Sequence, residues 1–285
     1  MHRGIVLFGN NIPYTLSPII HNTAFRISDL PYLYLTADIE PAQFKNALDA
    51  AQTLKFAGAN VTIPFKETVL KHTTSLSDAA KKIGAVNTLY FDNGRILGEN
   101  SDSPGFFKAY FNELKSLEDK TVLILGAGGA ARAVCDTIIT KTTPKKILIA
   151  NRNTERSNQL IEHLRKVYDY NSAGSLSMET SALQETAGDA AGIIQTTPVG
   201  SGRYINQSPV AESFQFNKEH IVIDLIYNPL ETKFLKHAGH FGARTRNGIS
   251  MLLHQAAFSF TLWTGTTFPM DEVTPVVMEY IKQRA

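Results

Sequence analysis

Residues 123–133 read Leu123-Ile124-Leu125-Gly126-Ala127-Gly128-Gly129-Ala130-Ala131-Arg132-Ala133. An apolar run that breaks into glycines and then into good helix formers predicts a strand, a tight turn and a helix. Gly126 suits the turn, while Gly128 and Gly129 let the backbone approach a pyrophosphate closely. The helix that starts near Ala130 then directs free N–H groups at an anion. The pattern predicts a nucleotide-phosphate cradle, although taken alone it also fits an ordinary strand-to-helix turn.

A second apolar run, 146–150, leads into Asn151-Arg152-Asn153 about twenty residues further on, where NAD-specific folds usually carry an acidic residue. No Asp or Glu stands at this place. Arg152, with Arg156 one helical turn later, instead supplies two cations suited to the additional phosphate of NADP. The spacing of the two features therefore favours NADP over NAD.

Composition bounds the rest of the prediction. A chain of 285 residues favours about two domains. With 28 Lys plus Arg against 26 Asp plus Glu, the net charge of +2 gives no global attraction to nucleic acid or membrane, so ligands must be recognised locally. A single cysteine, Cys135, excludes an internal disulfide and fits a reducing compartment. Without a signal peptide or an apolar run of membrane-spanning length, a cytoplasmic location is expected.

Apolar runs alternate with helical patterns in the first half of the chain, which indicates a mostly parallel sheet covered by helices. A hairpin is expected over 87–98, because Asn93-Gly94 is a strong turn signal. Ser103 and Pro104 resemble the cap and the first residue of a helix that leads into a second domain. That second domain has strand-like runs at 146–150, 192–195, 221–225 and 242–245.

Two further helical patterns, 250–263 and 271–283, find no strands left to cover in the second domain, so they are expected to pack on the first. The prediction is an α/β protein of two domains with a ligand cleft between them. Residues 1–103 plus 247–285 form a discontinuous α/β substrate domain with a mostly parallel sheet. Residues 104–246 form a doubly wound, Rossmann-like NADP-binding domain.

Polar residues follow several of the expected strands. Thr15 and Ser17 precede a helix start and offer hydroxyls to a carboxylate. Asn60 and Thr62 share one face of a strand by the two-residue period, and Lys66 comes just beyond them. Further motifs have the same character.

The full set is Thr15-Leu16-Ser17-Pro18 with His21-Asn22, residues 60–67, residues 84–88, Glu99-Asn100-Ser101-Asp102, the glycine turn, Asp224-Leu225-Ile226-Tyr227-Asn228-Pro229, and the tail 247–265. Together these motifs resemble the shikimate/quinate dehydrogenase family over nearly the whole chain, in order.

The resemblance implies reversible, NADPH-dependent reduction of 3-dehydroshikimate to shikimate, a step toward aromatic amino acids. It implies that Lys66 and Asp102 form the catalytic pair, and that Thr15 and Ser17 hold the substrate carboxylate. The ring hydroxyls would contact Asn60, Thr62, Asn87, Tyr227 and Gln255. The cofactor would be held by Gly126, Ala127, Gly128, Gly129, Ala130, Asn151, Arg152, Asn153, Arg156, Thr197, Leu225, Gly248 and Met251.

This chemistry also makes physical sense without the family. A hydride that arrives at a ketone carbon leaves negative charge on the oxygen, so a donor must stabilise or protonate that oxygen. The Lys66 ammonium is suited to this, and Asp102 is suited to orient it. Which of the two groups finally delivers the proton stays open.

The chain departs from the usual family pattern at several positions. Tyr14-Thr15 replaces His-Ser, Ser101 and Ser103 flank Asp102 where Thr and Gly are typical, and Ser201 replaces an apolar residue. Because Thr15 adds a methyl group near the carboxylate site, the choice between shikimate and the bulkier quinate stays open. The alternatives are a quinate/shikimate dehydrogenase that uses NAD, and a nucleotide-sensing homologue without catalysis. The expected partner is a small-molecule substrate, and no metal site is expected. The protein is expected to be a monomer or a homodimer.

Overall fold

The computed structural model describes residues 2–188 and 190–284. Within them the chain forms two compact units. Unit 1 contains residues up to Gly105 together with those from Leu253, and unit 2 contains Phe106–Leu252. The chain leaves unit 1 within helix α4 (Asp102–Ala109) and returns to it within helix α10 (Ile249–Thr264). The sequence patterns favour domain boundaries after residues 103 and 246. Both observed transitions lie later in the chain, inside helices.

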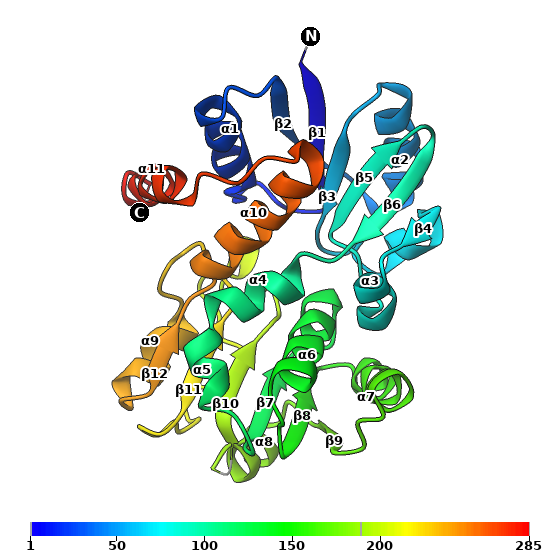
Figure 1. The fold of residues 1–285 in the computed structure, drawn as a ribbon. Coiled ribbons are helices and arrows are strands. Elements are labelled where there is room, and N and C mark those ends of the chain that lie inside the picture. Colours follow the sequence, from blue (N-terminus) through cyan, green and yellow to red (C-terminus); the bar gives the residue numbers. More distant parts are fainter. Residues whose placement is uncertain (1, 189, 285) are drawn as a thin grey trace. The chain divides into compact units, whose positions relative to one another are not determined.

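Unit 1 contains a six-stranded sheet with the order β2-β1-β3-β5-β6-β4 (Figure 1). β1 pairs in parallel with β2 and β3, β4 pairs in parallel with β6, and β5 is antiparallel to both of its neighbours. The expected mostly parallel sheet is therefore confirmed, with β5 reversed by the hairpin. The strands are β1 (Arg3–Gly9), β2 (Tyr32–Asp38), β3 (Gly58–Val61), β4 (Ser75–Leu76), β5 (Thr88–Asp92) and β6 (Arg95–Glu99).

The β5–β6 turn has the conformation that its sequence demands. Asn93 and Gly94 both have positive φ values, 47° and 77°, which match the right-handed twist of the flanking strands. This short turn brings the carboxyl end of β6 back to the start of β5. As a result Glu99 pairs with Thr88, and residues 100–102 follow directly at that edge of the sheet.

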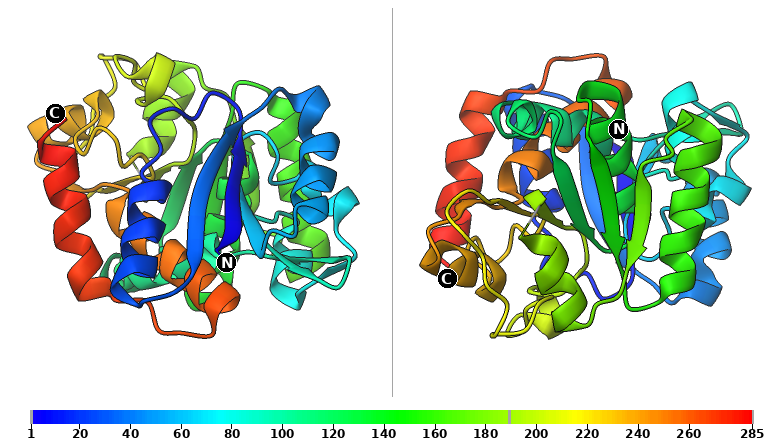
Figure 2. Two further views of the ribbon diagram at one scale, coloured as in Figure 1. Left: turned by 90° about the horizontal axis from the view of Figure 1, so that it is seen from above. Right: turned by 90° about the horizontal axis from the view of Figure 1, so that it is seen from below.

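Helices cover both faces of this sheet, and Figure 2 shows α1 (Ser17–Ile27) and α2 (Phe44–Thr53) on opposite faces. Val6 and Phe8 of β1 pack against Phe44 and Leu48 of α2 in one buried cluster. The other helical elements of unit 1 are η1 (Pro41–Gln43), η2 (Thr68–His72), α3 (Asp78–Ile83), α10 and α11 (Met270–Lys282), which packs against α1.

Helix α4 begins two residues earlier than expected, at Asp102 rather than Pro104. Asp102 is its first residue, and Asn100 Oδ1 accepts hydrogen bonds from the backbone N–H groups of Asp102 and Ser103 at 3.0 and 3.2 Å. The interpretation of Ser103 as the helix cap is therefore wrong. The side chain of Asn100 reaches two of the N–H groups that a helix start leaves without backbone partners.

Unit 2 contains a second six-stranded sheet, with the order β12-β11-β10-β7-β8-β9 and parallel pairing throughout. This order is that of the doubly wound dinucleotide-binding fold, and it confirms the Rossmann-like prediction. Chain order reverses between β7 and β10, the switch point at which such folds bind ligands. The strands are β7 (Thr121–Leu125), β8 (Lys146–Ala150), β9 (Ala173–Leu176), β10 (Ala190–Gln195), β11 (Ile221–Asp224) and β12 (Arg244–Arg246).

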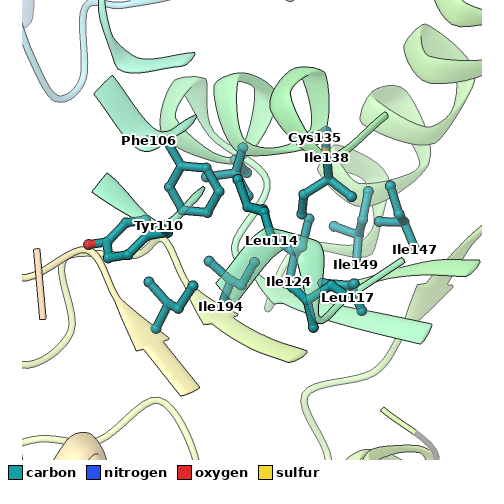
Figure 3. Packing of buried hydrophobic residues seen from close by; sticks show 14 of the residues in the cluster. Phe106, Tyr110, Leu114, Leu117, Ile124, Cys135, Ile138, Ile147, Ile149 and Ile194 are labelled. Atoms are coloured by element: carbon teal, nitrogen blue, oxygen red, sulfur yellow. The ribbon is translucent and has the colours of Figure 1, made fainter. Parts of the chain in front are cut away.

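Strand β7 is apolar from Val122 to Leu125, where both of its faces are buried. Val122 and Ile124 face one cluster, and Leu123 and Leu125 face another. Figure 3 shows the first cluster, in which Ile124 lies among residues of α6 and the rings of Phe106 and Tyr110. The helical elements of unit 2 are α5 (Phe111–Lys115), α6 (Gly129–Lys141), α7 (Thr154–Tyr168), α8 (Thr180–Ala187), η3 (Gly202–Tyr204) and α9 (Lys233–His240).

Candidate active site

Lys66 and Asp102 form an ion pair in unit 1. Lys66 Nζ donates a hydrogen bond to Asp102 Oδ2 at 2.5 Å, and the two side chains are 14% and 6% exposed. Asn87 Nδ2 donates to the other carboxylate oxygen, Oδ1, at 2.9 Å. Asp102 also opens helix α4, where the helix dipole favours a negative charge. The pair is thus held as a partly exposed ammonium against an almost fully buried carboxylate.

The backbone of three segments brings this pair together. The N–H of Val86 donates to the carbonyl of Lys66 at 2.8 Å, which ties the loop after β3 to the segment before β5. The N–H of Asn87 donates to the carbonyl of Glu99 at 3.2 Å, which extends the β5–β6 pairing toward Asp102. The catalytic candidates therefore depend on sheet register rather than on a flexible loop.

A buried polar network adjoins the pair. Asn60 Oδ1 accepts a hydrogen bond from the Tyr34 hydroxyl at 2.8 Å, and Asn60 Nδ2 donates to the carbonyl of Asn87 at 3.0 Å. The Ser101 hydroxyl accepts from Asn87 Nδ2 at 2.9 Å and donates to Gln255 Oε1 at 3.3 Å. Three of the residues expected to contact the substrate ring, Asn60, Asn87 and Gln255, therefore lie in one network with Asp102.

Thr15, Ser17 and Thr62 lie at the edge where β1 and β3 end. The Thr15 hydroxyl donates to Ser17 Oγ at 3.2 Å and accepts from the Ser17 N–H, directly at the start of α1. The N–H of Thr62 donates to the carbonyl of Phe8 at 2.9 Å, which joins the two strand ends. This edge offers two hydroxyls at a helix N-terminus, a suitable environment for an anion.

The glycine turn of unit 2 follows β7. Gly126 has a φ of +114°, a conformation that L side chains rarely adopt, and a Cβ there would lie 2.5 Å from Thr196 Oγ1. Gly128 differs: its φ of −95° suits any residue, and a Cβ there would meet no atom of the described residues within 4 Å apart from its own chain neighbours. Protein packing thus explains the glycine at 126 but not the one at 128. Ala127, Gly129 and Ala130 complete the turn and the start of α6.

The second cofactor candidate is the segment after β8. Asn153 caps α7 by accepting from the N–H of Glu155 at 3.0 Å, and Asn151 Nδ2 donates to the carbonyl of Asn153 at 2.8 Å. Arg152 and Arg156 are exposed beside this helix start. Cations are disfavoured at a helix N-terminus by the helix dipole, so an anion bound there would relieve an unfavourable arrangement.

Gln195, at the end of β10, organises the next loop. Its side chain is fully buried; Oε1 accepts from the Thr197 N–H at 2.5 Å, and Nε2 donates to the carbonyls of Thr197 and Val199. Thr196 closes the loop onto β7, since its N–H and its hydroxyl both donate to the carbonyl of Leu125. Thr197 is therefore held at the switch point of the sheet.

The remaining candidates of unit 2 follow β11. Asp224 is fully buried, and burial raises its pKa to about 7 even though Ile226 N–H and the Thr232 hydroxyl donate to it. Leu225 follows it, and a Cβ on Gly248 would lie 2.1 Å from the Leu225 carbonyl oxygen. Tyr227 is half-buried on the same loop. Met251 is only 6% exposed and belongs to the same buried cluster as Val122 and Ile124.

Residues 2–188 and 190–284 show no sign of two other kinds of site. In that range no group of three or more His, Cys, Asp or Glu side chains is arranged to hold a metal ion. In the same range no helix has both the length and the apolar character needed to cross a membrane.

Sequence reasoning missed several residues of these networks. Tyr34, Thr88 and Ser259 contact Asn60 but were not among the predicted site residues; Tyr34 lies outside the motifs, and Thr88 and Ser259 lie within them without a sign of a specific role. One signal was present for Ser259, which stands four residues after Gln255 and so shares a face of the same helix. Gln195 holds the loop after β10 through side-chain geometry that the sequence does not reveal.

Comparisons with known proteins agree with this arrangement. The family model for the shikimate dehydrogenase substrate binding domain matches residues 7–89, that for shikimate / quinate 5-dehydrogenase matches 109–225, and that for the shikimate 5'-dehydrogenase C-terminal domain matches 248–278. The shikimate dehydrogenase (NADP(+)) of Methanococcus maripaludis is 37% identical over 262 residues, which cover 91% of this chain and 90% of that protein. The chain belongs to the shikimate dehydrogenase family.

Solved structures of this family extend the likeness. A shikimate dehydrogenase in complex with NADP+ has a TM-score of 0.87 and 33% identity, covering 98% of this chain and 96% of its own. Quinate dehydrogenase from Corynebacterium glutamicum, in complex with NAD, has a TM-score of 0.85 and 27% identity, covering 98% and 99%. The structural relatives thus include a shikimate dehydrogenase solved with NADP+ and a quinate dehydrogenase solved with NAD.

Proposed function

We propose that this protein is a shikimate dehydrogenase that catalyses the reversible, NADPH-dependent reduction of 3-dehydroshikimate to shikimate. The observation that carries the proposal is the Lys66–Asp102 pair, a cation and a buried carboxylate 2.5 Å apart within a polar network suited to a hydroxylated ring. Membership of the shikimate dehydrogenase family, and relatives named as NADP(+) enzymes along most of the chain, support it independently.

The glycine turn fits the cofactor. Gly128 leaves open space in front of helix α6 that no protein atom requires, as expected where a pyrophosphate lies against helix N–H groups. Arg152 and Arg156 would hold the additional phosphate, with Asn151 and Asn153 shaping that loop. Thr197, Leu225, Gly248 and Met251 are proposed for the remainder of the site. When bound, NADPH supplies the hydride for the ketone carbon.

For the substrate, Thr15 and Ser17 at the start of α1 are proposed to bind the carboxylate through hydroxyl donors and the helix dipole. Asn60, Thr62, Asn87, Tyr227 and Gln255 are proposed for the ring hydroxyls. Asn60 and Gln255 are already fixed by neighbouring protein groups, so little conformational entropy is lost when a ligand binds.

Lys66 is proposed to donate a hydrogen bond, and then a proton, to the substrate oxygen as negative charge develops on it. Asp102 Oδ2 holds the ammonium in place, and Asp102 Oδ1 is held in turn by Asn87. In the oxidative direction the same groups accept the hydroxyl proton while the hydride leaves the ring carbon. The atoms balance as shikimate plus NADP+ giving 3-dehydroshikimate, NADPH and one proton.

The test is an absorbance assay at the reduced-nicotinamide band, with shikimate or quinate as substrate and NADP+ or NAD+ as cofactor. The proposal expects kcat/KM to be highest for shikimate with NADP+. A preference for quinate with NAD+ would support the second candidate, a quinate/shikimate dehydrogenase that uses NAD, which the likeness to the Corynebacterium glutamicum enzyme favours. Absence of turnover with all four combinations would overturn both.

A further inference from the structure

Ser259 is a fully buried hydroxyl on α10 that joins three other segments of unit 1. Its Oγ lies 2.8 Å from the Thr88 hydroxyl at the start of β5 and 3.2 Å from the Ser101 hydroxyl beside Asp102. It also accepts from Asn60 Nδ2 at 3.2 Å and lies 3.1 Å from the Gln255 carbonyl in its own helix. Two of these partners, Asn60 and Gln255, are proposed substrate residues.

The Asn60 amide shows what this hydroxyl achieves. Its nitrogen has two hydrogens and faces three acceptors, the carbonyl of Asn87 and the hydroxyls of Thr88 and Ser259. Its oxygen accepts from Tyr34, which uses one of two lone pairs. The amide is thereby fixed with its nitrogen directed inward, and the second lone pair of Oδ1 is the group it offers to a ligand hydroxyl.

We propose that Ser259 is a positioning residue for the substrate. It fixes the Asn60 amide and the helical turn between Gln255 and Ser259, so that Asn60 and Gln255 both recognise the substrate ring. The proposal rests on the proposed function. Ser259 contacts neither Lys66 nor Asp102, so it acts on substrate recognition rather than on proton transfer. The backbone N–H of Ser101 orients Asn87 toward Asp102, and this bond involves no residue of α10, whereas the Ser101 hydroxyl contacts both Ser259 and Gln255.

An ordinary structural role makes a different prediction. Alanine in place of serine on a buried helix face removes a polar group that must otherwise be satisfied, and helix propensity also favours alanine. If packing alone explained residue 259, Ser259→Ala would be neutral or stabilising and would leave substrate affinity unchanged. If Ser259 positions Asn60, the Ser259→Ala variant keeps its fold, but the Asn60 amide loses a hydrogen-bond partner that fixes it and substrate affinity falls.

The experiment compares Ser259→Ala with the wild type in steady-state kinetics and in calorimetric titration with shikimate. KM and Kd for shikimate are expected to rise about tenfold, the equivalent of one lost hydrogen bond in a buried site. The value of kcat is expected to stay within about twofold, and KM for NADP+ and the pH profile of kcat to stay unchanged. A variant that merely unfolds in part would instead lose kcat at constant KM.

A second variant tests the shared target. Thr88→Val removes the hydroxyl that also accepts from Asn60 Nδ2, with little change in shape. Because both hydroxyls act on one amide, the double variant is expected to raise KM by less than the product of the two single effects. Thr274→Val on α11 is the matched control, since it removes a hydroxyl that donates to a carbonyl one helical turn back and lies on another helix.

The outcomes separate this inference from the proposed function. Wild-type protein that neither binds nor oxidises shikimate overturns both. Active wild type with an unchanged KM and Kd in Ser259→Ala overturns only the positioning role, as does a rise in KM that Thr274→Val reproduces. Independent, multiplicative effects of Ser259→Ala and Thr88→Val would show that the two hydroxyls do not act through Asn60.

Discussion

Asn87 donates its side-chain N–H to Asp102 Oδ1 at 2.9 Å, and the backbone N–H of Ser101 donates to Asn87 Oδ1 at 2.7 Å. The second bond decides which way the Asn87 amide points, because an N–H can only donate to the oxygen end. The carboxylate of Asp102 is therefore held from its Oδ1 side, and Oδ2 is left to Lys66. An ammonium placed in this way is pre-organised for a developing negative charge.

Lys66→Ala is expected to lower kcat for shikimate oxidation about a hundred- to ten-thousandfold, the range typical of positioned acid–base groups. KM for shikimate is expected to change far less, because the carboxylate and ring contacts come from other residues. Steady-state kinetics with saturating NADP+ measure both values. Lys71→Ala, which removes an exposed lysine five residues further on, is the control and should keep wild-type turnover. Normal turnover of Lys66→Ala would remove Lys66 from the mechanism.

Gly128→Ala is expected to raise KM for NADP+ about tenfold or more while the free energy of unfolding stays within about 1 kcal/mol of wild type. A Cβ at this position meets no protein atom within 4 Å, so only a bound cofactor is displaced. Chemical denaturation and cofactor titration provide the two measurements.

Gly126→Ala is the contrasting variant for the glycine turn. A φ of +114° and a contact of 2.5 Å with Thr196 Oγ1 predict a loss of about 1–3 kcal/mol in stability. Stability losses of equal size in both variants, without a specific effect of Gly128→Ala on NADP+, would contradict the phosphate cradle.

Replacement of Arg152 or Arg156 by alanine is expected to raise KM for NADP+ about tenfold and to leave KM for NAD+ unchanged, because only NADP+ carries the additional phosphate. The effect should shrink as salt is added, since both arginines are exposed and screened. Arg165→Ala removes an arginine that is paired with Glu162 later on the same helix and serves as the control. An equal rise in KM for both cofactors would argue that the arginines shape the loop rather than bind the phosphate.

The backbone pattern of this fold was predictable because local sequence and global fold agree. The 123–133 stretch, the Asn93-Gly94 turn and the run at 146–150 each have a single good local solution, and the structure contains all three. The start of α4 was predicted two residues late, because Ser103 and Asn100 are both good caps and only geometry shows that Asn100 reaches the N–H groups.

The site was predictable only in part, for a physical reason. Lys66 and Asp102 stand in motifs, and their contact spans thirty-six residues that sheet pairing brings together. Ser259 and Thr88 come from segments 171 residues apart, and nothing in either segment marks a hydroxyl pair. Networks of this kind are specified by side-chain packing across elements, which a single sequence read along its length does not reveal.

His21 offers a prediction about stability. Its ring is fully buried on α1 and stacks on Tyr34 with centroids 4.4 Å apart, and among residues 2–188 and 190–284 neither ring nitrogen has a hydrogen-bond partner. Burial lowers its pKa from 6.5 to about 3, so the folded protein keeps it neutral where the unfolded chain protonates it. Because the unfolded state binds the additional proton, this histidine lowers stability as pH falls from about 6.5 toward 3.

His21→Phe keeps an aromatic ring in the stack and removes the titration. Between pH 7 and pH 5 the wild type is expected to lose about 2 kcal/mol more unfolding free energy than the variant. The loss arises because the unfolded wild type takes up one proton on His21 in this range, whereas the folded protein, in which the pKa of His21 is lowered, does not. Urea denaturation at the two pH values measures the difference between the proteins, which cancels the other titrating groups that they share. Stability curves that run parallel with pH would mean that His21 is protonated to the same extent in both states, which a ring without partners in this aromatic stack does not allow.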